Sequence, residues 1–368
     1  MDGLAPRMAD EDDTAPAARE MEPERMNRPS DHPEVTTERV GVLLINLGTP
    51  DGADYWSMRR YLKEFLSDTR VIEAPKLIWW PILNGLILTT RPQRSGEAYA
   101  KIWLQEEGES PLRHFTRAQA DALAARMAAA HPNLRVAWGM RYGNPSIAEG
   151  IEQLAAQGCR RILLAALYPQ YSAATAATAY DKAFEHLTTM RWQPAIRTLP
   201  AYHDDAAYID ALAASVRAGL DDARQAEGEP EMLLCSFHGL PEENLHKGDP
   251  YHCFCQKTGR LLREALDWPE DRFLTVFQSR FGPKEWLKPY ADVTVAELAR
   301  KGVKRLAMLS PGFAADCVET LEEIDIGLRE TFEENGGEHF RYIPCLNDGA
   351  PGMAMLERLV TRELGGWI

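Results

Sequence analysis

The sequence predicts an α/β fold with two similar, doubly wound, Rossmann-like domains whose parallel sheets face a central cleft. From Gly41 onward, short apolar runs end in clusters of glycine, proline and polar residues, and longer amphipathic stretches follow them. This is the alternation of strand and helix that builds parallel sheets. The connecting segments are long enough to cross over between parallel strands. Because 368 residues exceed one typical domain, we expect two.

The strands are predicted from the apolar runs, and the helices from apolar residues at helical spacing. Helical spacing is seen in Met58, Leu62 and Phe65, and again in Ile209, Leu212 and Val216 near the domain junction. The first domain is predicted to have strands at 42–47, 134–140 and 162–167, and the second at 232–237, 273–277, 306–309 and 342–345.

Composition shifts along the chain divide it into four parts. Residues 1–37 are rich in Pro, Ala and acidic residues without apolar periodicity, which predicts a disordered tail. We expect an N-terminal domain over 38–200 that carries an apolar lip at 77–94, and a C-terminal domain over 201–350. The last residues, 351–368, are predicted to form a helix that packs back on the fold.

Charge and hydropathy restrict the partners of the chain. The formal net charge of −14 argues against nucleic acid, which needs a basic surface. Six cysteines without paired CxxC spacing favour a reducing cytoplasm. No apolar segment reaches the length of about 20 residues that spans a bilayer. The segment 77–88, with Trp79 and Trp80, has the character of a membrane-interface segment, although packing in the core explains it equally well.

His238 is the first candidate for a catalytic residue. It follows the apolar run 232–237 and precedes Gly239 and Pro241, so it is expected at the carboxyl end of a strand. Ligands of open parallel sheets bind at these ends. A neutral imidazole can accept a proton or bind a metal near neutral pH. The alternative is a structural histidine with satisfied hydrogen bonds.

A second candidate site follows the turn at 310–312. Asp316, Glu319 and Glu323 are spaced by three and four residues, which predicts one helix face, with apolar residues such as Leu328 opposite. An ordinary solvated acidic face would look the same. A histidine facing carboxylates suits the removal of protons from a substrate while a divalent cation enters. Ser236 has no GxSxG context, and Gly48 belongs to no nucleotide-binding loop.

Eight segments together resemble the ferrochelatase family, of the bacterial type without an iron–sulfur extension. In chain order they are GVLLINLGTPD, YLKEFLSDTRVIE, GESPL, RYGNPSI, LYPQYS, SFHGLP followed by GDPY, QSRFGPKEWLKP and SPGFAADCVETLEEID. The resemblance implies a chelatase-like fold and the insertion of Fe²⁺ into protoporphyrin IX, bound in a distorted shape in the cleft between the domains. The products would be protohaem and two protons.

The resemblance also implies roles for individual residues. The catalytic residues would be His238, Glu319 and Glu323, and His238 and Glu319 would also bind the metal, with Asp316 beside the pocket. Whether His238 accepts pyrrole protons or guides the metal stays open. The residues that contact the porphyrin would be Leu47, Arg91, Ser110, Arg141, Tyr142 and Trp286.

Departures from the family pattern limit what is carried over. Leu47 stands where other members have methionine or tyrosine, and Cys317 where some have histidine. The chain ends in GGWI without a cysteine-rich extension, so we expect no [2Fe-2S] cluster and no tightly bound cofactor. The expected location is the cytoplasmic side of a membrane, with peripheral attachment through the lip. Alternatives are a chelatase for cobalt or coproporphyrin, or a non-catalytic haem- or metal-binding protein. The oligomeric state stays open.

Overall fold

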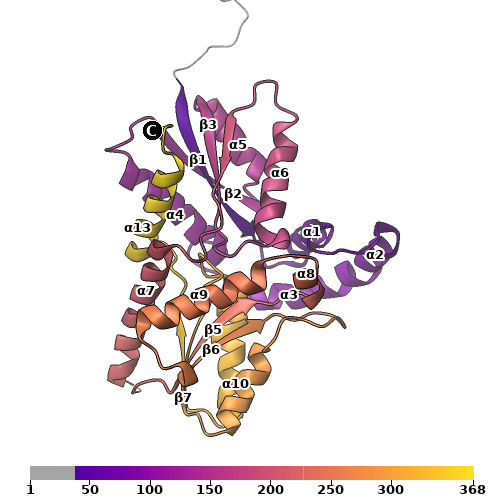
Figure 1. The fold of residues 1–368 in the computed structure, drawn as a ribbon. Helices are drawn as coiled ribbons and strands as arrows, with labels where there is room; N and C mark the ends of the chain where they lie inside the picture. Colours follow the sequence, from indigo (N-terminus) through magenta and orange to yellow (C-terminus); the bar gives the residue numbers. More distant parts are fainter. Residues whose placement is uncertain (1–37, 227) are drawn as a thin grey trace, which may run out of the picture. The chain divides into compact units, whose positions relative to one another are not determined.

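The computed structural model describes residues 38–226 and 228–368, and the predicted tail at 1–37 lies outside the described residues. The segment Thr37–Ile368 forms one compact unit. Within it, two four-stranded sheets lie one above the other in the view of Figure 1, and helices cover their faces. The structure therefore confirms an α/β fold with two parallel sheets.

The first sheet has the strand order β2-β1-β3-β4, and all its strands run parallel. Its central strand β1 (Arg39–Gly48) is almost entirely buried, as expected for a strand covered on both faces. Leu43 and Ile45 of β1 pack against α5 and α6, and Val42 and Leu44 contact the cluster that contains α4. The other elements are β2 (Leu134–Tyr142), β3 (Cys159–Ala166), β4 (Ala195–Thr198), α4 (Pro111–Met127), α5 (Ile147–Ala156), η2 (Ala173–Ala177) and α6 (Thr178–Leu187).

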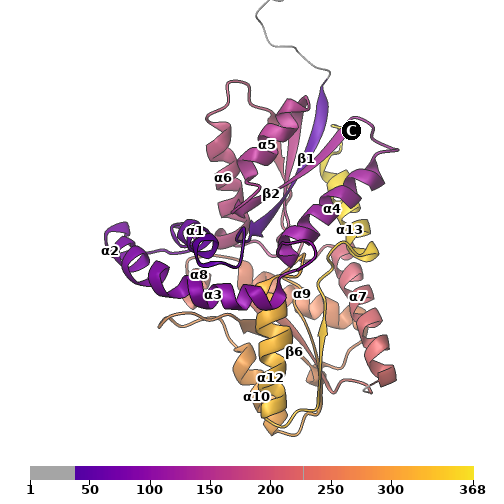
Figure 2. The same cartoon turned by 180° about the vertical axis from the view of Figure 1, so that it is seen from behind.

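The second sheet repeats this order as β6-β5-β7-β8, again with parallel strands. One face packs against α10 and α12, which Figure 2 shows in front of the sheet. Its strands are β5 (Met232–His238), β6 (Phe273–Gln278), β7 (Arg305–Leu309) and β8 (His339–Ile343). Its helices are α7 (Ala206–Ala226), α8 (Glu242–His246), α9 (Tyr251–Leu266), η3 (Glu270–Arg272), α10 (Ala291–Arg300), α11 (Val318–Thr320), η4 (Leu321–Leu328), α12 (Arg329–Glu334) and α13 (Ala350–Glu363).

A single apolar cluster joins the two sheets. It contains residues of β1, β3, β5 and β7 together with α4, α7, α9 and α13. The helix α13 packs on α7 and α4, which is the packing expected for the last residues of the chain. Because the sheets share one core, the division between 38–200 and 201–350 stays a prediction rather than a visible break.

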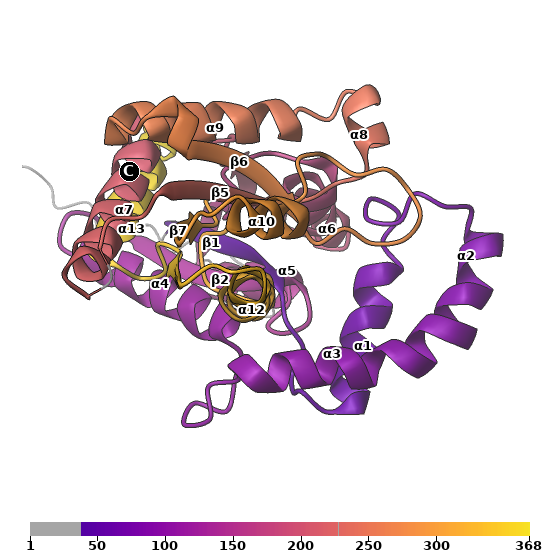
Figure 3. The ribbon, with the colours of Figure 1, turned by 90° about the horizontal axis from the view of Figure 1, so that it is seen from below.

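Four helical segments between β1 and α4 form an arm (residues 55–102), which comprises α1 (Tyr55–Leu66), α2 (Lys76–Ile82), η1 (Leu83–Ile87) and α3 (Leu88–Ile102). α1 begins at Asp54, whose side chain accepts hydrogen bonds from two backbone N–H groups of the first turn. The inner faces of α1 and α3 form a separate apolar cluster that includes Tyr142. α2 lies at the outer end of the arm (Figure 3), so the predicted lip is a projecting helical segment.

Two strands differ from the sequence-based expectation. β4 was not expected, and β8 begins three residues and ends two residues before the predicted run at 342–345. Both strands lie at sheet edges and contain polar residues, so neither forms a continuous apolar run. β2 and β6 also lie at sheet edges but were predicted from their apolar runs, so the polar residues of β4 and β8, rather than edge position, weaken the signal.

The helix predicted after residue 312 is also different. A single regular helix was expected, whereas the chain forms the short α11, the π-helical η4 and then α12. A π-helix has i→i+5 hydrogen bonds and wider turns, and such segments often occur at functional sites. The widened segment contains Glu323, with Glu319 in the turn before it.

Candidate functional site

His238 is the last residue of β5 and is half-buried at the carboxyl end of the sheet. It is paired in register with Gln278, the last residue of β6. The ring nitrogen Nδ1 lies 2.7 Å from the carbonyl oxygen of Gly239. A proton on Nδ1 would be donated to that carbonyl, which leaves Nε2 as an acceptor. The predicted position of His238 at a strand end is confirmed.

Gly239 keeps this region close-packed. A Cβ atom at residue 239 would lie 2.7 Å from the carbonyl oxygen of Gln278 and 3.1 Å from the ring of Trp286. The Gly239 N–H donates to the same Gln278 carbonyl at 2.7 Å. The absence of a side chain therefore lets the loop after β5 lie directly against β6, with Trp286 beside it.

Glu319 and Glu323 face the ends of the same two strands. The side-chain amide nitrogen of Gln278 donates to the Glu319 carbonyl oxygen at 2.7 Å and lies 3.4 Å from a carboxylate oxygen of Glu323. The Ser279 hydroxyl also donates to that Glu323 oxygen. The structure thus joins the backbone of Glu319 and the carboxylate of Glu323 to the strand end that is paired with His238.

Burial raises the pKa of Glu323, and the nearby charge of Glu319 raises it further. Hydrogen bonds from Ser279 and Gln278 and the proximity of His238 act in the opposite direction without cancelling the rise. A carboxyl group with a raised pKa exchanges protons more readily near neutral pH. Glu323 is therefore suited to accept a proton that leaves a neighbouring group.

Asp316 does not share the helix face that its spacing predicted, and this expectation is wrong. Its side chain is 3% exposed and accepts hydrogen bonds from the Tyr342 hydroxyl at 2.6 Å and the Asn347 amide at 2.7 Å. The Thr320 hydroxyl donates to it as well, at 2.9 Å. Asp316 precedes the first helical residue, Val318, so helical spacing does not apply to it. It holds the loop and the start of α11 together instead.

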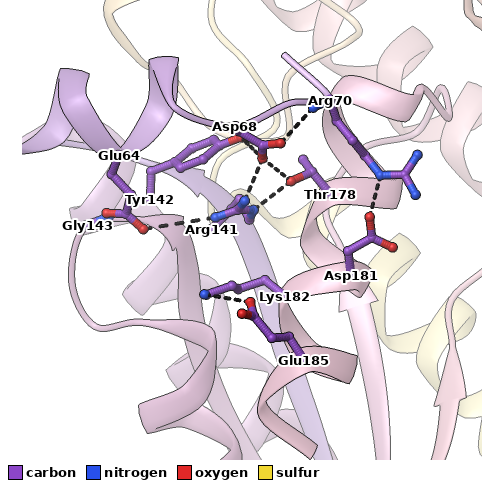
Figure 4. A network of polar contacts seen from close by, with 10 residues as sticks. All are labelled: Glu64, Asp68, Arg70, Arg141, Tyr142, Gly143, Thr178, Asp181, Lys182 and Glu185. Atoms are coloured by element: carbon purple, nitrogen blue, oxygen red, sulfur yellow. Dashed lines mark hydrogen bonds and ion pairs between the residues drawn. The ribbon is translucent and has the colours of Figure 1, made fainter. Parts of the chain in front are cut away.

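Arg141 and Tyr142, at the end of β2, are held by a carboxylate from the arm (Figure 4). Asp68 accepts hydrogen bonds from the Arg141 guanidinium, from the Tyr142 hydroxyl at 2.7 Å, and from the Thr178 hydroxyl. The guanidinium carbon of Arg141 also lies 4.3 Å from the centre of the Tyr142 ring. The structure therefore fixes both predicted residues in one buried network.

The charge on Asp68 is stabilised by this network. Burial acts to raise the pKa of Asp68, but hydrogen bonds from Thr178, the Arg70 N–H and Tyr142, with the charge of Arg141, lower the pKa overall. Asp68 therefore stays ionised and keeps the Arg141 side chain paired. Sequence reasoning missed this residue, because nothing in the local sequence links it to a strand end 73 residues away.

Three tyrosines with buried hydroxyls lie near Glu319, and two of them also near Tyr142. Burial raises the pKa values of Tyr61 of α1 and Tyr99 of α3, and the charge of Glu319 adds to both. Tyr168, which follows β3, is half-buried, but its hydroxyl is buried, which raises its pKa, and Tyr142 and Glu319 raise it further. These phenols stay protonated and form a neutral wall near the acids. Tyr61 and Tyr99 stand on helices and resemble ordinary core residues, and residue type alone did not single out Tyr168 after β3.

Two further predicted contacts, Arg91 and Trp286, lie near each other. The guanidinium carbon of Arg91, on α3, lies 4.7 Å from the ring centre of Phe281. The Trp286 indole N–H donates to the Phe281 carbonyl at 2.9 Å. Burial lowers the pKa of Arg91, and Glu323 partly opposes this. Phe281 was not predicted, although it belongs to the QSRFGP segment.

The two remaining predicted contacts differ in position. Leu47 is half-buried near the end of β1 and packs on the cluster that contains Tyr142. Ser110 is 1% exposed, and its hydroxyl accepts the Arg113 N–H at 3.3 Å as the cap of α4. No described contact joins Ser110 to the other site residues, so its role toward a porphyrin stays a prediction.

The metal-binding roles of His238 and Glu319 also stay a prediction. Across the described residues, no three His, Cys, Asp or Glu side chains gather as a metal site.

Comparison with known proteins identifies the family of the chain. The ferrochelatase family model matches residues 39–364. The chain belongs to the ferrochelatase family. It is 59% identical to the ferrochelatase of Agrobacterium fabrum over 92% of this chain and 98% of that protein. It is 58% identical to the ferrochelatase of Rhizobium meliloti over 93% of this chain and all of that protein. The family resemblance seen in the sequence is confirmed.

Solved structures support the fold alone. SirB from Bacillus subtilis, determined with Fe³⁺, has a TM-score of 0.51 and 11% identity, covering 88% of this chain and 95% of that chain. DR2241 from Deinococcus radiodurans, described as similar to chelatases, has a TM-score of 0.50 and 11% identity, covering 89% of this chain and 55% of that chain. The predicted chelatase-like fold is confirmed.

Within residues 38–226 and 228–368, no helix combines the length and the apolar character that crossing a bilayer requires.

Proposed function

We propose that the chain inserts Fe²⁺ into protoporphyrin IX, with the macrocycle bound in a distorted shape between His238 and the Arg141–Tyr142 pair. As a member of the ferrochelatase family, the chain is an enzyme that forms haem from a porphyrin and iron. The observation that carries the assignment of the site is the position of a strand-end histidine beside Gln278, whose side chain and neighbour Ser279 hold two glutamates at the same sheet edge.

The chemistry requires an acceptor for two protons. A free-base porphyrin has two pyrrole N–H groups, and binding of Fe²⁺ to the four nitrogens releases both protons. Nε2 of His238 is one candidate acceptor if Nδ1 donates to Gly239. Glu323, whose pKa is raised by burial and by Glu319, can accept a proton next. A bent macrocycle would expose its nitrogen lone pairs to the incoming ion.

His238→Ala tests this assignment. We expect iron insertion to fall by about 100-fold or more, as is typical when a general base is removed. Insertion would be measured anaerobically from the absorption bands of protoporphyrin and haem after mixing the purified protein with protoporphyrin and Fe²⁺. Circular dichroism would confirm folding. His246→Ala is a matched control, because the side chain of His246 is 74% exposed on α8.

The same assay separates the alternatives. Faster insertion of Co²⁺, or faster reaction of coproporphyrin, would identify a related chelatase. Tight haem binding without insertion would identify a binding protein. If His238→Ala keeps more than a tenth of the wild-type rate, the assignment of His238 is wrong.

We also propose that the outer end of the arm binds the surface of a membrane and receives the apolar porphyrin there. Leu77 is 92% exposed, Ile78 63%, Leu86 61% and Trp80 51%, all on α2 or η1. Exposed apolar residues gathered on one segment, with tryptophan among them, are typical of membrane-interface helices. Trp79 is different, because its indole N–H donates to the Leu66 carbonyl at 2.7 Å and fixes α2 to α1.

Binding to lipid vesicles tests the membrane proposal. The variant Leu77→Ala with Trp80→Ala should reduce co-sedimentation with phospholipid vesicles several-fold, because it removes apolar area at the arm. Trp192→Ala is the control, since Trp192 is 49% exposed but lies outside the arm. Equal sedimentation of the wild type and the arm variant would refute the membrane proposal and leave the assignment of His238 unaffected.

A further inference from the structure

Gln278 at the end of β6 and Ser279 directly after it contact the acids of the proposed site, but the function proposed above assigns neither of them a role of its own. The side chain of Gln278 is 6% exposed, and Ser236 of β5, which is fully buried, donates its hydroxyl to the Gln278 amide oxygen at 2.6 Å. A hydroxyl donor on the amide oxygen sets the orientation of the group. The NH₂ end of Gln278 therefore points away from the sheet, toward η4.

The amide nitrogen of Gln278 bonds to the segment where α11 passes into η4. It donates to the Glu319 carbonyl oxygen at 2.7 Å and approaches the Glu323 carboxylate at 3.4 Å. One side chain thus fixes the main chain at one acid and contacts the side chain of the other. A buried donor of this kind is costly to leave without a partner, so the arrangement is strongly preferred.

Ser279 has an unusual backbone conformation. Its φ of 65° is in the left-handed region, which residues other than glycine rarely adopt and which is common at functional sites. In this conformation its hydroxyl donates to the same Glu323 oxygen that Gln278 approaches. The unfavourable backbone geometry therefore coincides with a hydrogen bond to a half-buried carboxylate.

We propose that Gln278 and Ser279 are positioning residues for iron insertion, which hold the Glu319 backbone and the Glu323 carboxylate in place opposite His238. This inference rests on the function proposed above. Both side chains direct their polar hydrogens at η4 and its preceding turn. Their loss should displace the acids and lower kcat, while the porphyrin KM and the porphyrin dissociation constant stay close to the wild-type values.

Substitutions at Ser279 separate the hydroxyl from the backbone. Glycine and asparagine both tolerate a positive φ, but only asparagine keeps a hydrogen-bond donor. Ser279→Gly should lower kcat by about 10-fold to 100-fold, the cost of a small misplacement of a reacting group. Ser279→Asn should recover most of that loss. If Ser279→Asn is as slow as Ser279→Gly, the hydroxyl is not what positions Glu323.

Gln278→Glu tests the amide. The substituted side chain has the same shape and can still accept from Ser236, but it presents an oxygen in place of a donor toward Glu319 and Glu323. We expect a fall in kcat of about 10-fold or more. Should this variant fail to fold, Gln278→Met provides a neutral side chain of similar length without the donor. Glu322→Gln is the control, because Glu322 lies on η4 beside Glu323 but pairs with Lys101 of α3.

The outcomes distinguish this inference from the proposed function. If the wild type inserts iron and folded Gln278 and Ser279 variants match its kcat, the positioning role is refuted and the proposed function stands. If the variants lose porphyrin affinity in proportion to activity, the residues shape the binding surface and the positioning role is also refuted. Failure of the wild type to insert iron would refute the proposed function instead.

Discussion

Replacing Asp68 tests how strongly one carboxylate of the arm stabilises the end of β2. The Asp68 side chain is 7% exposed, and its ion-pair partner Arg141 is 12% exposed. Tyr142 and Thr178 donate their hydroxyls to the same carboxylate oxygen. Asp68→Ala removes all of these hydrogen bonds at once and leaves the largely buried Arg141 guanidinium with the half-exposed Glu64 carboxylate, 4.0 Å away, as its remaining ion-pair partner.

The expected cost follows from this burial. Removing one partner of a buried ion pair typically destabilises a protein by about 3–5 kcal/mol, because the remaining charge is uncompensated. That is a large part of a typical free energy of unfolding of about 5–15 kcal/mol. The double variant Asp68→Ala with Arg141→Met removes both charges. It should be less destabilised than the sum of its single variants, by about 1–3 kcal/mol.

The effect should also depend on pH. The pKa of Asp68 is lowered in the folded state, so its contribution to stability is present above the unfolded pKa of about 4. That contribution is lost as the pH falls from this value through the lower, folded pKa. The difference in stability between the wild type and Asp68→Asn should therefore be full at pH 7 and shrink below about pH 4.

Urea unfolding followed by circular dichroism, at pH 7 and at steps below pH 4, measures both effects. Asp181→Ala is a suitable control, because Asp181 pairs with Arg70 nearby but is 54% exposed. A loss below about 1 kcal/mol for Asp68→Ala, as expected for surface pairs, would refute the reasoning. A difference between the wild type and Asp68→Asn that persists unchanged at low pH would refute the assigned ionisation.

Two further predictions concern packing. Gly48→Ala should destabilise the protein by about 2 kcal/mol or more, because φ is 117° and the added Cβ would lie 1.8 Å from the Tyr142 carbonyl oxygen. Gly108→Ala, at φ 68° with no atom within 4 Å, should cost about 1–2 kcal/mol. Phe332→Ala, at a fully buried site, should cost about 3–5 kcal/mol in urea unfolding, whereas Phe281→Ala, at a half-exposed site, should cost under about 1 kcal/mol. Equal losses of stability for Gly48→Ala and Gly108→Ala would contradict the packing described here. Equal losses for Phe332→Ala and Phe281→Ala would contradict it as well.

The sequence predicted β1, β2, β3, β5, β6 and β7 well because each contains a largely apolar run, including β2 and β6 at the sheet edges. It predicted His238 for a related reason, since a polar residue directly after such a run marks the strand end. The edge strands β4 and β8 lack that signal. The turns at α11 and η4 contact Gln278 of β6, which lies more than 40 residues earlier in the chain, and local helical spacing cannot indicate such contacts.

The missed site residues share one property, which is that their roles depend on pairing across the fold. Gln278 is significant because β6 pairs with β5 in the register that places it beside His238. Asp68 is significant because the arm returns to the end of β2. Residue type alone did not identify Gln278, Ser279 or Asp68 as candidate site residues, although all three lie in segments that carry the family resemblance.

The proposed site residues are held at the ends of two sheets that share one apolar core. Arg141 and Tyr142 are held at the first sheet, while Glu319 and Glu323 are held at the second, and one apolar core joins both sheets. The arm has its own apolar cluster, and Val318 and Leu321 beside the acids pack against it. We therefore expect porphyrin binding to move the arm rather than the sheets. Any such movement would reach Glu319 and Glu323 through these two apolar contacts.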